Sequence, residues 1–183
     1  MKKMLILIVL VVTLMATPVM AKEGFFIGAF FIPTEKISGD FGQGLDSGSG
    51  YGFKAGLGFN KYFSIEGVLE RSNFDVKGGG ASVELDGLAV DLRINFPLTT
   101  LDSAKIMSFE PYVLFGYGKY DAESGSQSFS GNGPRVGIGI EQYLFRELSV
   151  NVGYTATRAT FDTKPEEDGT IRTFEVGLIY HFL

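Results

Sequence analysis

Apolar residues alternate one by one with small or polar residues along several segments of this chain. Between residues 51 and 59, aromatic or aliphatic side chains occupy the odd positions, and glycine or lysine occupies the even ones. The same alternation returns at 88–96, 136–140, 148–156 and 174–182, with Ile179 as an exception. Successive side chains of a β-strand point to opposite faces of its sheet. A period of two therefore predicts strands with one apolar and one polar face.

Eight such strands are predicted, at residues 24–34, 49–59, 63–74, 82–96, 109–120, 134–143, 147–161 and 171–182. The connections between them alternate in kind. Polar, glycine-rich or charged stretches at 35–48, 75–81, 121–133 and 162–170 predict exposed loops. The links at 60–62 and 144–146 are tight, and a longer one at 97–108 follows the fourth strand.

An even number of such strands, with long loops at one end and short turns at the other, is typical of outer-membrane barrels. In hydrocarbon a sheet must close so that no edge amide is left unpaired. We therefore predict an all-β fold, an eight-stranded antiparallel up-and-down transmembrane β-barrel. Charged residues on the polar parity would point into this barrel and form a polar network of Lys54, Glu66, Glu70, Asp91, Arg93, Glu110, Arg135, Glu141 and Glu175. Carboxylates outnumber cations in this set, so we expect one of them to be protonated or hydrated.

Alternation alone also fits a soluble antiparallel barrel or sandwich, whose apolar face would be its core. Two features favour the membrane. Aromatic residues stand at the short-turn ends of strands and would form an inner girdle of Phe59, Phe63, Phe96, Phe109, Tyr180 and Phe182. Four cations on the apolar parity stand at the long-loop ends, where they would meet lipid headgroups, whereas a soluble core would not tolerate them unpaired: Arg71, Lys119, Arg158 and Arg172.

The first 21 residues have the features of a secretory signal peptide. Lys2 and Lys3 precede an apolar run that is too short to span a bilayer comfortably, and small or aliphatic residues stand before Ala21. We expect residues 1–21 to be removed on export and residues 22–183 to form the barrel domain. The signal carries Lys2 and Lys3 and no acid, so its removal takes the formal net charge from −5 to −7.

Composition excludes several functions. The chain has no cysteine and one histidine, which rules out disulfides, thiolate metal sites and histidine-rich metal clusters. Its net negative charge argues against a nucleic-acid partner. The single histidine, His181, falls on the inward parity at the short-turn end, and no serine is expected to have a histidine and an acid as partners. We therefore predict no enzyme activity, no cofactor and no metal site.

The sequence resembles the small outer-membrane β-barrel proteins of Gram-negative bacteria, a family that includes opacity-type, porin-like and OmpA-like barrels. The resemblance rests on the segments 24–28, 52–59, 63–67 and 110–113 and on a terminal run of Phe174, Val176, Leu178, Tyr180 and Phe182. It implies that the terminal strand, with Phe174, Tyr180 and Phe182, is the signal read by the barrel-assembly machinery. This chain departs from the family pattern because it ends in Leu183 and not in phenylalanine.

The function expected from these features is structural or surface-interacting, with loops exposed outside and a lumen filled by side chains. Eight strands enclose little more than room for side chains. The alternative is a small porin-like channel for ions or small solutes, and a lipid-modifying barrel enzyme is disfavoured. The expected partners are lipopolysaccharide at the basic rim and a ligand of the loops, whose few large apolar residues, Phe41, Leu45 and Phe129, stand among glycine, serine and aspartate.

Overall fold

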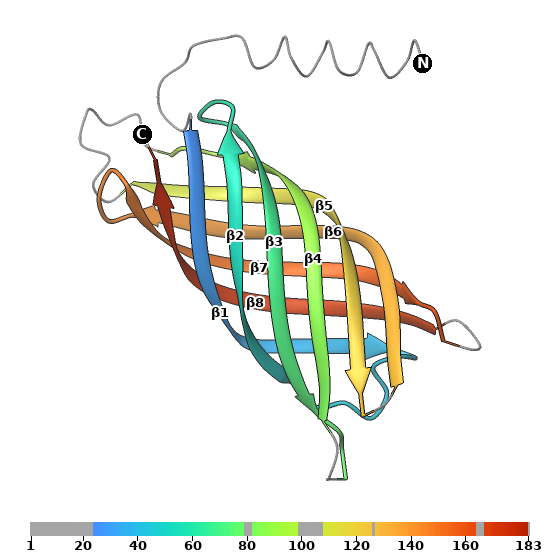
Figure 1. Cartoon of the computed structure of the whole chain (residues 1–183). Coiled ribbons are helices and arrows are strands. Elements are labelled where there is room, and N and C mark those ends of the chain that lie inside the picture. The colour runs from blue at the N-terminus through green and yellow to red at the C-terminus, as the bar shows by residue number, and fades with distance from the viewer. Residues whose placement is uncertain (1–23, 79–81, 99–107, 126, 164–166, 183) are drawn as a thin grey trace, which may run out of the picture.

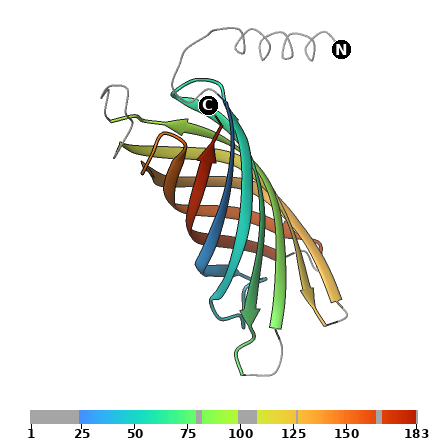
Figure 2. The same ribbon diagram turned by 60° about the vertical axis from the view of Figure 1, so that its left-hand side comes forward.

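The polypeptide forms a closed barrel of eight antiparallel strands, in which each strand pairs with its neighbours in sequence and β1 pairs with β8. The structure is a computed structural model that describes residues 24–78, 82–98, 108–125, 127–163 and 167–182. The strands tilt relative to the long axis of the barrel (Figure 1 and Figure 2). Their bounds are β1 Gly24–Gly39, β2 Gly48–Gly58, β3 Phe63–Asp75, β4 Ser82–Asn95, β5 Phe109–Ser124, β6 Gln127–Tyr143, β7 Leu148–Phe161 and β8 Glu167–His181.

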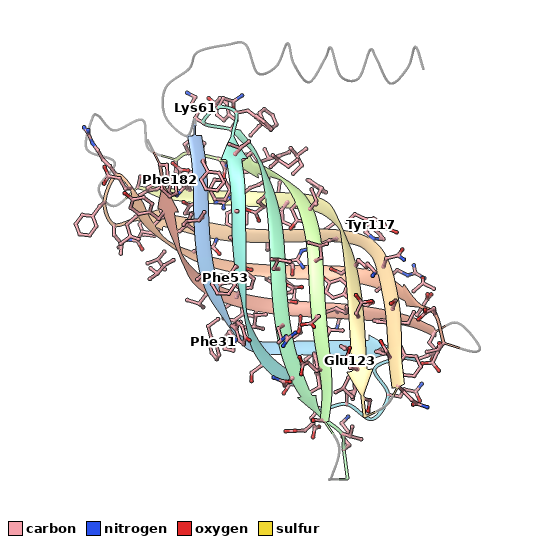
Figure 3. The ribbon with its side chains drawn as sticks, in the orientation of Figure 1. Phe31, Phe53, Lys61, Tyr117, Glu123 and Phe182 are labelled. Carbon is pink, nitrogen blue, oxygen red and sulfur yellow. The ribbon has the colours of Figure 1, made fainter. Side chains whose placement is uncertain are left out.

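Burial alternates along the strands as the sequence predicts. In β3 every second side chain from Ser64 to Phe74 is buried, and the residues between them are exposed. The exposed set of the barrel is largely aliphatic and aromatic, and it includes Phe31, Phe53 and Tyr117, which project from the wall in Figure 3. An apolar outer wall around a polar interior is the arrangement that hydrocarbon requires. The predicted eight-stranded barrel is therefore confirmed.

Several strands are longer at the long-loop end than the sequence predicts. β1 runs to Gly39, and β5 and β6 form one hairpin that closes with Ser124 opposite Gln127. β8 already begins at Glu167. These added lengths are polar or mixed on both faces, so the hydrophobic alternation fades there while backbone pairing continues. The predicted loops at 35–48, 121–133 and 162–170 are thus wrong in part.

A bend in β1 shapes the end of the barrel that carries the long loops, here called the outer end. The register shifts between Ile32 and Glu35 on the β2 side, around Pro33, which has no N–H to donate. Beyond the bend β1 follows β8 as far as Gly39 opposite Gly169 and departs from β2 (Figure 1). The loop that follows crosses to the outer end of β3, where Leu45 bridges to Val76.

The end with the short turns is here called the inner end. β1 begins there and β8 ends there (Figure 1). The expected signal peptide at 1–21 lies outside the described residues, as do most of the link at 97–108 and the terminal Leu183. Among the residues that the structure describes, no helix is long and apolar enough to cross a membrane.

Candidate functional site

All nine charged residues expected to face the lumen are buried inside the barrel. They come from β2 to β6 and from β8. Barrel closure is what brings them together, because most of these partners lie on strands that do not pair. The interior is best described in three levels, from the outer end to the inner end.

The level nearest the outer end is centred on Arg135. Its Nη1 donates hydrogen bonds to Glu70 Oε1 at 3.0 Å and to the hydroxyl of Tyr120 at 2.8 Å. Its Nε lies 3.2 Å from Asp91 Oδ2. The Tyr120 hydroxyl in turn lies 3.0 Å from Thr157 Oγ1. One guanidinium therefore links β3, β4, β5 and β6 across the lumen.

The middle level holds a buried ion pair between β2 and β8. Lys54 Nζ donates to Glu175 Oε1 at 2.5 Å, and the ammonium lies 4.8 Å from the centre of the Phe30 ring. Beside this pair, Asn151 Nδ2 donates to the Tyr112 hydroxyl at 2.7 Å. The two charges neutralise each other in surroundings of low dielectric constant. Loss of one partner would therefore leave an isolated buried charge.

The level nearest the inner end is centred on Arg93. Its guanidinium pairs with Glu141, donates from Nε to Asn95 Oδ1 at 2.8 Å, and stacks over the Tyr112 ring at 3.7 Å. Glu66 lies farther away, at 3.9 Å from Nη1. Glu110 of β5 is also buried and lies opposite Glu141 of β6 in the register of the two strands. In this level, as in the one around Arg135, carboxylates outnumber cations.

Glu35 is a buried carboxylate that the sequence reading missed. It is 1% exposed and accepts a hydrogen bond from Thr173 Oγ1 at 2.5 Å. Before the bend at Pro33 the inward residues of β1 are even-numbered, as at Phe30 and Ile32, and after it they are odd-numbered. The bulge therefore reverses the parity and turns Glu35 inward. Only a marker of the bulge, such as Pro33 between two strand-like runs, could have indicated it.

A serine, a histidine and an acid meet at the inner end of the barrel, contrary to the expectation that no serine has such partners. Ser149 Oγ lies 3.2 Å from His181 Nε2 and donates to Glu141 Oε1 at 2.6 Å. The same Nε2 atom lies 2.7 Å from Glu141 Oε1. A catalytic triad needs the acid on the ring nitrogen opposite the serine. Here serine and acid share one nitrogen, so the group is a hydrogen-bonded cluster without triad geometry.

Apolar side chains fill the outer end of the lumen. We call this cluster the outer plug. The aromatic ring of Phe41, from the loop after β1, stacks on Phe161 with 3.8 Å between ring centres. The prediction of exposed loops is therefore wrong for Phe41, Leu45 and Phe129, which are partly buried against this cluster. The outer plug consists of Ile37, Phe74, Val83, Leu85, Tyr120, Ala122, Ala159, Phe161 and Ile171, with Phe41, Leu45, Val76 and Phe129 packed against it.

The four predicted basic-rim residues are all exposed near the outer end, yet three of them have carboxylate partners. Arg71 donates from Nε and Nη2 to Asp86 at 2.6 and 2.8 Å, and its Nη1 lies 2.9 Å from Glu84. Lys119 pairs with Asp121 at 3.2 Å, and Arg158 pairs with Asp168 at 3.2 Å. Arg172 lies opposite Lys36 of β1. The interpretation of these cations as unpaired is thus corrected for three of them.

The aromatic residues predicted for the inner girdle are found at the inner end, exposed except for the partly buried Phe59. Phe182 lies at the same end of the barrel as Lys61 (Figure 3), and its ring is 5.0 Å from the Tyr180 ring and 5.5 Å from the Phe25 ring. The backbone N–H of Phe182 donates to the Phe25 carbonyl at 2.8 Å, which extends the closure of the barrel past His181. Phe174, of the same terminal run, lies farther out, between Tyr154 and Thr34.

A closed eight-stranded wall that is apolar outside and ionic inside defines a class, the outer-membrane β-barrel proteins. The family model of the outer membrane protein beta-barrel domain matches residues 6–182. The chain therefore belongs to that family and is a protein of the bacterial outer membrane. Comparison with curated proteins gives no match.

Solved structures with a similar fold include three bacterial outer-membrane and surface proteins. Ail, the attachment invasion locus protein of Yersinia pestis, is 18% identical, with 87% of this chain and 99% of that chain covered and a TM-score of 0.56. OprG from Pseudomonas aeruginosa is 18% identical, with coverages of 88% and 98% and a TM-score of 0.56. Neisserial surface protein A is 13% identical, with coverages of 87% and 98% and a TM-score of 0.60. At these identities the likeness concerns the fold.

Proposed function

We propose that this protein is a nonenzymatic surface-interaction barrel, in which the wall anchors the chain and the outer loops and strand ends carry recognition. The observation that supports this proposal is the filled lumen. The outer plug occupies one end, and the levels around Arg135, Lys54 and Arg93 follow it to the other end. The alternative of a small porin-like channel finds no support in this packing.

The size of the buried side chains strengthens the argument against conduction. Arg93, Arg135, Tyr120, Tyr143, Phe74 and Phe161 are among the largest side chains that are less than 2% exposed. An eight-stranded barrel has an interior just wide enough for its own side chains. Glycines of the inward face leave space that aromatic rings take, as where Phe30 lies against Gly52 and Phe26 against Gly56. An ion would have to displace several packed groups at once.

The absence of enzyme activity is also part of the proposal. The cluster of Ser149, His181 and Glu141 lacks triad geometry, and Ser149 is fully buried. The cluster also lies at the inner end, away from the outer leaflet in which lipopolysaccharide is found. A hydrolase or acyltransferase acting on that lipid would need its nucleophile near the outer end, within reach of the reacting bond.

Two partners belong to this proposal. Lipopolysaccharide phosphate is expected at the outer rim, because Arg71, Lys119, Arg158 and Arg172 are exposed there and arginine suits phosphate as a charge-assisted donor. The barrel-assembly machinery is expected to bind the terminal strand through Tyr180 and Phe182. Beyond these two, the proposal includes an extracellular ligand of the outer loops; Ail, which has a similar fold, has been crystallised with the heparin analogue sucrose octasulfate.

Conductance across a planar bilayer tests the filled lumen. Purified, folded protein is expected to give no stable current steps at neutral pH, and ion-selective steps from the wild-type protein would overturn the proposal. Orientation is tested with single cysteines, because the native chain has none. Glu123→Cys and Lys61→Cys lie at opposite ends of the barrel (Figure 3). On intact cells, a membrane-impermeant maleimide should label position 123 and not position 61.

A further inference from the structure

The outer wall of the barrel has an apolar groove. Small residues on three adjacent strands, Ala29, Ala55 and Gly67, form its floor, and larger neighbours such as Phe53 and Leu69 stand beside them. The groove has a volume of about 700 Å³. Register places Ala55 directly opposite Gly67, so the two small residues form one low point across β2 and β3. Phe53 projects from the wall next to it (Figure 3).

The barrel itself does not require a glycine at position 67. A Cβ built there would meet only the Ala55 carbonyl oxygen, at 3.9 Å. At the inward glycines the situation is the opposite, since a Cβ at Gly52 would lie 2.2 Å from the Phe30 ring and one at Gly116 would lie 1.9 Å from Asp91 Oδ1. Glycine weakens a strand when nothing approaches it closely. The space above Gly67 is therefore open on the outer face of the wall.

The groove continues into a polar pocket at the outer end. The two hollows share Phe53, Leu69 and Leu88 in their linings, and the second one has a volume of about 330 Å³. Two cations, Arg71 and Lys119, line that pocket together with Tyr51. Its lining also includes three acidic residues, Glu70, Asp86 and Asp121. The apolar groove is thus an extension of a charged site and not an isolated hollow.

The groove runs obliquely from the inner to the outer part of the wall. Its lining begins near the inner ends of β7 and β8, at Leu148 and Tyr180, and it ends at Leu88. Leu88 lies opposite Leu69 on one side and Lys119 on the other. An amphiphile whose chain lay in the groove would therefore have its headgroup at the level of Arg71 and Lys119.

Both cations have carboxylate partners and still keep donors free. Asp86 and Glu84 accept hydrogen bonds or ion-pair contacts from three of the Arg71 nitrogens, which fixes the plane of the guanidinium. Five N–H groups belong to an arginine and three to a lysine, so donors remain after these contacts. A preorganised guanidinium with donors to spare suits an oxyanion such as phosphate.

We propose that the polar pocket and the groove together bind one molecule of lipopolysaccharide. An acyl chain lies over Leu88, Leu69, Gly67 and Ala55, and a phosphate of its lipid A part accepts hydrogen bonds from Arg71 and Lys119. A second copy of the chain would explain the apolar groove but not its continuity with the charged pocket. The inference rests on the proposed partnership with lipopolysaccharide and adds a location and an acyl-chain site to it.

The test uses the folded full barrel in detergent, titrated with lipid A that carries its phosphates. Binding is followed as the rise in the temperature at which gel mobility changes from folded to unfolded, because a ligand of the folded state stabilises it by mass action. Arg71→Gln with Lys119→Gln should weaken binding about tenfold or more, since hydrogen bonds between charged groups are lost. Gly67→Leu with Ala55→Leu should weaken it as well, because the leucines fill the groove.

Two matched controls lie outside this site. Ala156→Leu changes a half-buried alanine of β7, and Arg146→Gln changes an exposed cation in the turn between β6 and β7 at the inner end, away from the basic rim. Both should bind lipid A as the wild-type protein does. Lipid A without phosphates should bind less tightly than the intact lipid.

The outcomes test the partnership with lipopolysaccharide and the location of its site separately. If intact lipid A fails to stabilise the wild-type barrel, the proposed partnership itself is wrong. If it stabilises the wild type and both double variants equally, the partnership stands and this site is wrong. Equal losses in the site variants and in the two controls would also overturn the location, since binding would then be spread around the wall.

Discussion

Phe41 lies flat on Phe161, with 3.8 Å between ring centres and 7° between ring planes. The contact joins the loop after β1 to the inward face of β7, and Phe129 of β6 meets Phe41 edge-on at 6.1 Å. The loop is further held by backbone hydrogen bonds to the outer end of β3, from Asp46 N to the Asp75 carbonyl and from Lys77 N to the Gly44 carbonyl. The mouth of the barrel is therefore covered by packed chain.

Phe161→Ala should destabilise the protein strongly. Phe161 is fully buried in the outer plug, and truncation of a buried phenylalanine costs about 3–5 kcal/mol in the free energy of unfolding. Urea titration in detergent micelles, read by gel mobility, measures this change. Phe53→Ala is the matched control, because Phe53 is 58% exposed and should cost less than half as much. Equal losses for the two variants would mean that the plug does not stabilise the barrel.

Arg135→Gln should destabilise the barrel strongly, whereas Glu35→Gln should not. Arg135 is within 3.2 Å of both Glu70 and Asp91, so its loss leaves two buried carboxylates uncompensated and should cost about 3–5 kcal/mol. Glutamine at position 35 keeps an acceptor for Thr173 and removes one charge from an acid-rich interior. We expect Glu35→Gln to be neutral or stabilising in the same urea assay. A loss as large as that of Arg135→Gln would show that the Glu35 charge is needed.

Lys54 and Glu175 should show strong coupling in a double-mutant cycle. Either Lys54→Met or Glu175→Gln alone leaves a charge buried, which costs several kcal/mol, whereas replacing both removes the imbalance. The double variant should therefore be more stable than the sum of the single effects predicts, by about 1–3 kcal/mol. The cycle needs all four proteins folded in one detergent. Additive effects would indicate that water compensates the pair.

The sequence predicted the wall of this barrel well and its interior only in part. Parity along a strand tells which side chains point inward, which is why Lys54 and Glu175 could each be placed in the lumen. It does not tell which inward side chains meet, because these two residues are 121 positions apart and lie on strands that do not pair. Contacts across a lumen depend on the stagger of all eight strands.

Two further findings could not be predicted by counting alternate residues along the strands. The bulge around Pro33 reverses the inward parity of β1, so Glu35 could not be assigned by counting from Phe31. The loop after β1 contains glycine, serine and aspartate, and its two apolar residues, Phe41 and Leu45, gave no periodic pattern. Their burial depends on a tertiary contact with Phe161 and Val76, which no local sequence signal specifies.

Gly116→Ala and Gly67→Ala should differ in sign, although both replace a strand glycine by the same residue. A Cβ at position 116 would lie 1.9 Å from Asp91 Oδ1 and 2.3 Å from the Val90 carbonyl oxygen, so the backbone of β4 would have to move. Overpacking of this kind costs about 1–3 kcal/mol. At position 67 the Cβ enters open space, and the loss of glycine's freedom in the unfolded chain should stabilise the barrel by about 0.4–1 kcal/mol. Urea unfolding of both variants beside the wild type measures the difference. Destabilisation by Gly67→Ala would indicate that the wall itself needs the glycine, and the groove would then lose its main support.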